Sequence, residues 1–205
     1  MKGILFTEWK TKEIAARGCD FEWQTRRIVN PQPDDNGLWN DDKFPRSLDS
    51  TLTGWNGTVE ATGESKEFKP RYKVGENIYI KEPFFIDDDR IIYRYDKYVG
   101  DHLICKWGNP RTMAAKQARY FIEITAVRCE RLQDISDLDC FKEGIKHRVG
   151  AVPPYESFYQ ISKHPNMYYT PKQAYERLIN DINGKGTWER NPFVWVYSFK
   201  LKINN

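Results

Sequence analysis

The chain lacks the features that mark secreted, membrane-spanning and metal-binding proteins. Its four cysteines, Cys19, Cys105, Cys129 and Cys140, form no C-x-x-C pair, and the three histidines add no closely spaced ligands. Structural zinc sites need such spacing. No apolar run approaches membrane-spanning length, and residues 1–6 are too short for the apolar part of a secretion signal. We therefore expect reduced thiols, no metal, no cofactor, no membrane partner and a cytoplasmic location.

The sequence also has no large excess of positive or negative charge. Lysine and arginine number 32 against 29 aspartates and glutamates, which gives a formal net charge of +3. A net charge this small does not by itself predict a nucleic-acid partner. It still permits one, because a basic cleft can form where the total is nearly balanced.

Aromatic residues, by contrast, are plentiful and spread along the whole chain, at 15% of 205 residues. They favour a folded core over a long disordered tail. We expect one domain, 1–205, with the turn-rich ranges 34–70 and 146–169 as two long inserted loops.

Short strands dominate the expected secondary structure. The sequence predicts strands at 3–6, 24–29, 77–82, 91–95, 103–107, 120–131 and 193–199, and helices at 7–16, 136–144 and 170–183. The last helix has the clearest signals, with Thr170-Pro171 at its start, Ala174, Leu178 and Ile182 on one stripe, and Gly184 as its stop. Many short strands with few helices predict an α+β fold.

Four separated segments resemble one family in the same order. The first comprises residues 4–6, a helix, and QTRRI (24–28) followed by PQP (31–33). The second runs from YKVGE (72–76) to IKE (80–82). The third covers 123–145, including RLQDIS (131–136) and EGI (143–145), and the fourth is NPFVWVYSFK (191–200). Together they resemble the ASCH-domain proteins of bacteriophages and prophages.

The resemblance implies a small PUA-like β-barrel with flanking helices and a cleft between barrel and helices. Members of the family are regarded as RNA-binding modules, and some small ones are amidohydrolases that deacetylate acetylated cytidine. Those enzymes use a Lys, a Thr three residues later and a Glu from a short helix. Thr25 and Glu143 fall on the Thr and Glu positions, whereas Glu22 occupies the Lys position. A Thr hydroxyl needs a base to take its proton, so Glu22 completes the catalytic candidates.

Further candidates would bind a ligand instead of reacting with it. Arg26 and Arg27 alternate along a strand, so at most one faces a cleft directly, where it would pair with phosphate or stack on a base. Lys81 and Glu82 alternate in the same way. Tyr79 is a possible stacking platform, although an aromatic in a strand is more often part of the core.

Three functional hypotheses follow. The first is binding of RNA, single-stranded nucleic acid or a modified nucleoside, with affinity that falls as salt rises. The second is an amidohydrolase of 4-N-acetylcytidine-like nucleosides that uses Thr25 and Glu143. The third is a phage accessory protein that binds a host protein through the loops 34–70 and 146–169, where aromatic residues such as Tyr155 and Tyr159 gather.

Overall fold

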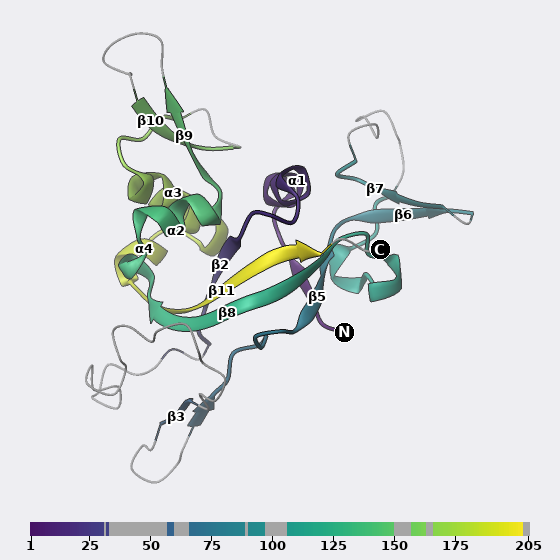
Figure 1. The fold of residues 1–205 in the computed structure, drawn as a ribbon, viewed down its shortest axis with the longest axis horizontal. Coiled ribbons are helices and arrows are strands. Elements are labelled where there is room, and N and C mark those ends of the chain that lie inside the picture. Colours follow the sequence, from purple (N-terminus) through teal and green to yellow (C-terminus); the bar gives the residue numbers. More distant parts are fainter. Residues whose placement is uncertain are drawn as a thin grey trace. The chain divides into compact units, whose positions relative to one another are not determined.

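The structure, a computed structural model, describes residues 1–30, 32, 57–59, 66–88, 90–96, 106–149, 157–162 and 166–202. These residues form a mixed α+β fold (Figure 1). Its helices are α1 (Glu8–Arg17), α2 (Asp137–Glu143), α3 (Pro171–Asn183) and α4 (Thr187–Arg190), with three short 3₁₀ turns at Pro110–Thr112, Ala115–Gln117 and Leu132–Asp134. Its strands are β1 (Gly3–Leu5), β2 (Trp23–Ile28), β3 (Gly57–Val59), β4 (Lys66–Phe68), β5 (Asn77–Lys81), β6 (Phe84–Asp87), β7 (Arg90–Tyr93), β8 (Phe121–Arg131), β9 (Ile145–Val149), β10 (Ser157–Ile161) and β11 (Phe193–Lys202).

The largest sheet has five strands in the order β1-β5-β8-β11-β2. β1 runs parallel to β5, with Gly3 opposite Tyr79, and β5 runs antiparallel to β8, with Asn77 opposite Glu123. Three two-stranded sheets are formed by β3 with β4, β6 with β7, and β9 with β10. In the described part of the chain, β1 and β2 are the two ends of the large sheet, and no pairing between them closes it into a barrel.

The chain divides into two compact units, each made of separated segments. Unit 1 comprises Met1–Glu22, Gly75–Ile124 and Phe199–Asn205, and unit 2 comprises Trp23–Val74 and Thr125–Ser198. β8 and β11 each contribute residues to both units.

The core of unit 1 combines one helix with strand side chains. Ile14 of α1 is fully buried, as are Ile78 and Ile80 of β5. Phe6 stacks on Phe199 with ring centroids 5.3 Å apart. Lys10 is also buried, with its Nζ atom 5.6 Å from the centre of the Phe6 ring, so its aliphatic stem covers apolar surface and its charge rests on an aromatic face.

Unit 2 contains the remaining helices, each fixed by local signals. The Ser136 hydroxyl accepts a hydrogen bond from the Asp139 amide at 3.1 Å and starts α2. Gly144 ends α2 in the left-handed region, with φ of 109°, and the chain enters β9 at the next residue. α3 begins at a Thr170 cap and ends at Gly184, as expected, but its buried stripe ends at Leu178 and Ile179, and Ile182 is exposed.

The range 146–169, which we expected to be a loop, contains most of β9 and all of β10. These strands pair antiparallel, with Ile145 opposite Ile161. The other expected loop, 34–70, lies mostly outside the described residues, apart from the β3–β4 hairpin. So does most of the strand expected at 103–107, of which residues 106 and 107 are irregular. Among the described residues, no helix has both the length and the apolar character needed to cross a membrane.

Candidate functional site

β2 and α2 carry three of the predicted site residues in unit 2. Thr25 and Arg26 lie on β2 and Glu143 ends α2, which packs against β2. All three residues are buried. The Arg26 Nη1 atom lies 3.2 Å from Glu143 Oε1, so the structure brings together a predicted ligand-binding residue and a predicted catalytic one.

Arg26 is the centre of a buried ion-pair network. Its side chain is completely inaccessible, and it also pairs with Glu130 at 2.7 Å and with Asp139 at 3.1 Å. Arg128 pairs with the same two carboxylates at 2.8 Å each, through the second oxygen of Glu130 and through the same oxygen of Asp139 that Arg26 contacts. A buried guanidinium is stable only with such compensation. The hydrogen bonds from Arg26 to Glu130, Asp139 and Glu143 fix α2 and β8 against β2.

The electrostatics of Arg26 follow from this environment. Burial alone would lower the pKa of Arg26, but the negative charges of Glu143 and Glu130 outweigh burial and raise it above its ordinary value. Tyr175 lies beside the guanidinium, 5.9 Å from ring centre to Cζ, and burial raises the pKa of its phenol well above the usual range. Neither group can accept a proton from a threonine hydroxyl near neutral pH.

Arg27 has different neighbours. It is half-buried, and the groups that act on it electrostatically are Tyr72, Tyr197, the Glu143 carboxylate that Arg26 also contacts, and a second arginine, Arg71. Burial lowers the pKa of Arg27, and the positive charge of Arg71 adds a smaller shift in the same direction. The Arg71 amide donates to the Tyr197 hydroxyl at 3.0 Å, and the Arg71 guanidinium lies 5.5 Å from the centre of the Tyr72 ring.

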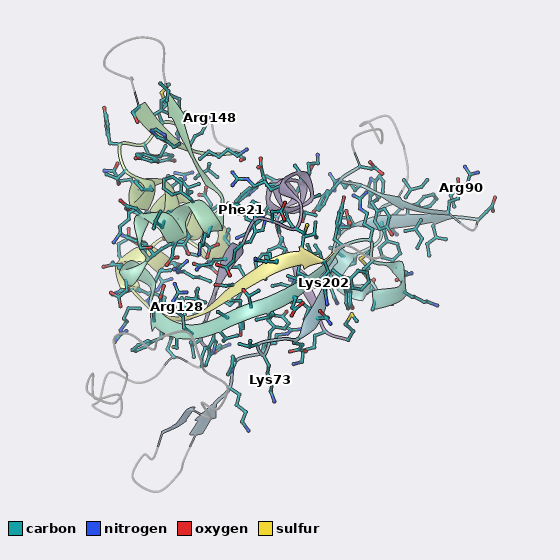
Figure 2. The ribbon with its side chains drawn as sticks, in the orientation of Figure 1. Phe21, Lys73, Arg90, Arg128, Arg148 and Lys202 are labelled. Carbon is teal, nitrogen blue, oxygen red and sulfur yellow. The ribbon has the colours of Figure 1, made fainter. Side chains whose placement is uncertain are left out.

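Further exposed cations lie in the short segment that contains Arg71. Lys69, Arg71 and Lys73 alternate in sequence and all three are exposed; Lys73 is labelled in Figure 2 and projects away from the ribbon. We call Arg27, Lys69, Arg71 and Lys73 the basic strip. A strip of cations on one unit is suited to phosphate groups, which are anionic and accept several hydrogen bonds.

The other predicted ligand-binding residues lie in unit 1 and are used internally. The Tyr79 hydroxyl donates to the Met113 carbonyl at 2.9 Å, and the Lys81 ammonium donates to the Arg111 carbonyl at 2.8 Å. Both side chains therefore hold the segment 106–120 against β5. Glu22, the residue at the expected Lys position, is half-buried at the end of the first segment of unit 1.

Glu82 forms a second buried ion pair. Its side chain is fully inaccessible and accepts two hydrogen bonds from Arg119, both at 2.8 Å. Arg119 also lies over Tyr93 and Tyr120, with ring centres at 4.3 and 4.8 Å. Burial raises the pKa of Glu82, and the hydrogen bonds from Arg119 oppose that shift only in part.

Thiol and metal chemistry find no support among the described residues. Cys19, Cys129 and Cys140 are free thiols, and burial raises the pKa of both Cys129 and Cys140 to about 12. A thiol with so high a pKa is a poor nucleophile. Nowhere in the described ranges do three or more His, Cys, Asp or Glu side chains gather in a way that would hold a metal ion.

The sequence alone did not predict most of the groups that surround Arg26 and Arg27. Glu130 and Asp139 contact Arg26 from more than 100 residues away, Arg128 contacts those two carboxylates, and no local sequence pattern predicts this network. The basic strip had a visible signal, since cations alternate at positions 69, 71 and 73. That alternation does not by itself predict a binding site, because only the fold brings Arg27 near Arg71.

Comparisons of the chain with protein-family models, with curated proteins and with solved structures found no match.

Proposed function

We propose that this chain binds RNA or another single-stranded nucleic acid, or a nucleotide-like fragment of one, through the basic strip of unit 2. The observation that carries the proposal is the group of three exposed cations, Lys69, Arg71 and Lys73, in one short segment of unit 2 with Arg27 among the charges near Arg71. A phosphate group can accept hydrogen bonds from several such side chains at once.

The resemblance to ASCH-domain proteins supports the same function. On that basis we propose that the five-stranded sheet, together with residues outside the described ranges, forms a PUA-like barrel, and that the protein works in the cytoplasm of a bacterial or phage-infected cell. The QTRRI segment, which carries the resemblance, also contributes Arg27 to the basic strip.

The surroundings of Thr25 and Glu143 favour binding over amide hydrolysis. Hydrolysis through Thr25 requires a nearby group that can accept the hydroxyl proton. The cation placed at Glu143 is Arg26, whose raised pKa keeps it protonated, and the Glu143 carboxylate is occupied by that ion pair. We therefore expect no turnover of 4-N-acetylcytidine by the folded protein. Turnover by the wild type that is lost in both Thr25→Ala and Glu143→Ala would contradict this part of the proposal.

The test is fluorescence anisotropy with a labelled single-stranded RNA, measured over a range of salt concentrations. We expect the binding constant to fall as salt rises, with a logarithmic slope of about −0.7 for each phosphate contacted. Arg71→Ala and Lys73→Ala should each weaken binding and each reduce that slope by about 0.7, because each removes one phosphate contact.

Arg177→Ala is the matched control, since Arg177 is an exposed arginine of unit 2 that pairs with Asp181 on α3. It should leave affinity and slope unchanged. Absence of binding by the wild type at low salt, or equal losses in Arg71→Ala and Arg177→Ala, would overturn the basic strip as the binding surface.

A further inference from the structure

The outer side of α3 lines a groove of about 670 Å³ in unit 2, which we call the α3 groove. Gln173, Glu176, Arg177, Asn180 and Asp181 line it, and their spacing of three and four residues places them on one side of the helix. All five side chains are exposed or half-buried, so the groove is open to solvent. Its volume lies within the roughly 300–1,000 Å³ typical of small-molecule sites.

The rest of the lining comes from the segments on either side of α3. Tyr168 precedes the helix, and Lys185 and Glu189 follow it, the latter on α4, which packs against α3 (Figure 1). Backbone hydrogen bonds of 2.8 and 3.0 Å join Tyr168 to Tyr159 of β10 in both directions. The groove is therefore built from segments that are fixed to one another within unit 2.

The two amide side chains of the α3 groove are oriented by the protein itself. The Gln173 Oε1 atom accepts from the Tyr169 and Thr170 amides at 3.1 and 3.3 Å, and the Asn180 Oδ1 atom accepts from the Trp188 amide at 2.9 Å. Both oxygens are thus occupied, and in the described part of the chain neither NH₂ group has an acceptor. Gln173 and Asn180 therefore supply hydrogen-bond donors to the groove.

Three charged side chains of the α3 groove have no partner within the described ranges. Glu176, Lys185 and Glu189 form no hydrogen bond or ion pair there, although charges of both signs line the same groove. Arg177, by contrast, pairs with Asp181 at 3.0 Å and is used within α3. Glu176 is half-buried, and a carboxylate that is partly withdrawn from water is stabilised by a cation. The groove thus presents two unpaired carboxylates, one unpaired ammonium and two amide donors.

We infer that the α3 groove binds a free basic amino acid, such as arginine or lysine. This ligand complements the unpaired groups, because its α-ammonium and its side-chain cation match Glu176 and Glu189, and its carboxylate matches Lys185 and the amide donors. A purely cationic ligand would leave Lys185 unpaired, and a purely anionic one would meet the two carboxylates. The inference does not depend on the proposed function, since the α3 groove shares no residue with the basic strip.

Isothermal titration calorimetry with arginine and two analogues tests the ligand groups one at a time. Agmatine lacks only the carboxylate of arginine, and citrulline replaces the guanidinium by a neutral urea group of the same shape. We expect each analogue to bind the wild type about 2- to 12-fold more weakly than arginine does, which is the range for loss of one hydrogen-bonded contact.

Variants of the α3 groove test the protein groups in the same assay. Glu176→Gln should weaken arginine binding about 10- to 100-fold, because it removes the half-buried carboxylate. Glu189→Gln and Lys185→Met change exposed groups and should each weaken it about 2- to 5-fold. Lys185→Met should leave agmatine binding unchanged, since agmatine has no carboxylate, and a general effect on the fold would not spare one ligand.

Glu8→Gln is the matched control, because Glu8 is an exposed glutamate of unit 1 that pairs with Lys12. It changes the net charge by the same amount as Glu176→Gln and should bind arginine like the wild type. Circular dichroism of each variant establishes that it is folded.

Several results would overturn the inference. If the wild type binds no arginine at millimolar concentration, or if Glu176→Gln and Glu8→Gln bind it equally well, the α3 groove is not the site. If agmatine binds as tightly as arginine, no group of the protein contacts the carboxylate, and the groove is a site for simple organic cations. If a tripeptide that ends in arginine binds more tightly than arginine, the ligand is a peptide and not a free amino acid.

Discussion

At the scale of single residues, the structure separates two uses of arginine. Arg26 and Arg119 each neutralise carboxylates of the protein itself, with Glu143 and Glu82 as their most buried partners. Arg27 and Arg71 instead lie near each other, at the edge of the core. Adjacent positions in QTRRI thus have different roles because successive strand residues point to opposite faces. The sequence predicted that alternation, but not which of the two arginines is inside.

Replacing Arg119 by methionine should destabilise the protein and make its stability depend on pH. Glu82 would remain fully buried without its cation, which costs about 3–5 kcal/mol of unfolding free energy at neutral pH. The folded pKa of Glu82 is already raised by burial, and loss of Arg119 raises it further. Because the carboxyl pKa is raised in the folded state, the folded protein takes up the proton at a higher pH than the unfolded chain does. The loss of unfolding free energy should therefore shrink as pH falls through the folded pKa of Glu82, and be smallest below the unfolded pKa of about 4.3.

Urea denaturation from about pH 4, near the unfolded pKa of a glutamate, to about pH 8 measures this effect. The double variant Arg119→Met/Glu82→Gln is the control, because it removes the charge that Arg119 compensates. It should recover part of the lost stability and show no added pH dependence relative to the wild type. A pH-independent loss in the single variant would show that Arg119 acts by packing on Tyr93 and Tyr120 alone.

At the scale of elements, predictions succeeded where local signals agree. The alternating strand expected at 120–131 is observed as Phe121–Arg131, and the capped helix expected at 170–183 is observed as Pro171–Asn183. β3, β4, β6, β9 and β10 were missed, since each is a short strand whose partner, and not its own pattern, makes it a strand. Such pairing is tertiary information and is only weakly present in a local window.

The cap of α3 offers a direct test of how local signals act. The Thr170 hydroxyl accepts from the Gln173 amide at 3.2 Å, and the Gln173 side chain accepts in return from the Thr170 amide at 3.3 Å. Thr170→Ala removes the first of these bonds and should lower the unfolding free energy by about 1 kcal/mol. Thr170→Ser keeps the hydroxyl and should differ little from the wild type, and urea midpoints of the three proteins decide. Equal losses in both variants would mean that the threonine methyl group, and not the cap, is responsible.

At the scale of the whole molecule, composition is a poor guide to binding. The net charge of +3 is small, yet unit 2 carries the four cations of the basic strip. The resemblance predicted Thr25 and Glu143 as site residues, and alternation along a strand made Arg26 and Arg27 candidates for binding. Neither argument pointed to Arg71, which becomes a candidate only when the fold places it near Arg27.

Two charge-matched variants separate local from total charge. One variant replaces the four cations of the basic strip by alanine. The other replaces Lys12, Lys116, Arg177 and Lys202 by alanine, and these four residues are exposed and lie outside the basic strip. Each lowers the formal net charge by four, from +3 to −1. The scattered set breaks only surface ion pairs such as Lys12–Glu8 and Arg177–Asp181, which contribute about 0–1 kcal/mol each.

If the basic strip contacts phosphates, its variant should lose most of the salt dependence of RNA binding. Four lost contacts correspond to a change of about 3 in the logarithmic slope, since each phosphate on a single strand contributes about 0.7. The scattered variant has the same net charge but keeps the strip, so its slope should stay within about one contact of the wild type. Anisotropy titrations from low to physiological salt compare the three proteins. Equal slopes for the two variants would mean that total charge, and not the arrangement around Arg27, attracts the nucleic acid.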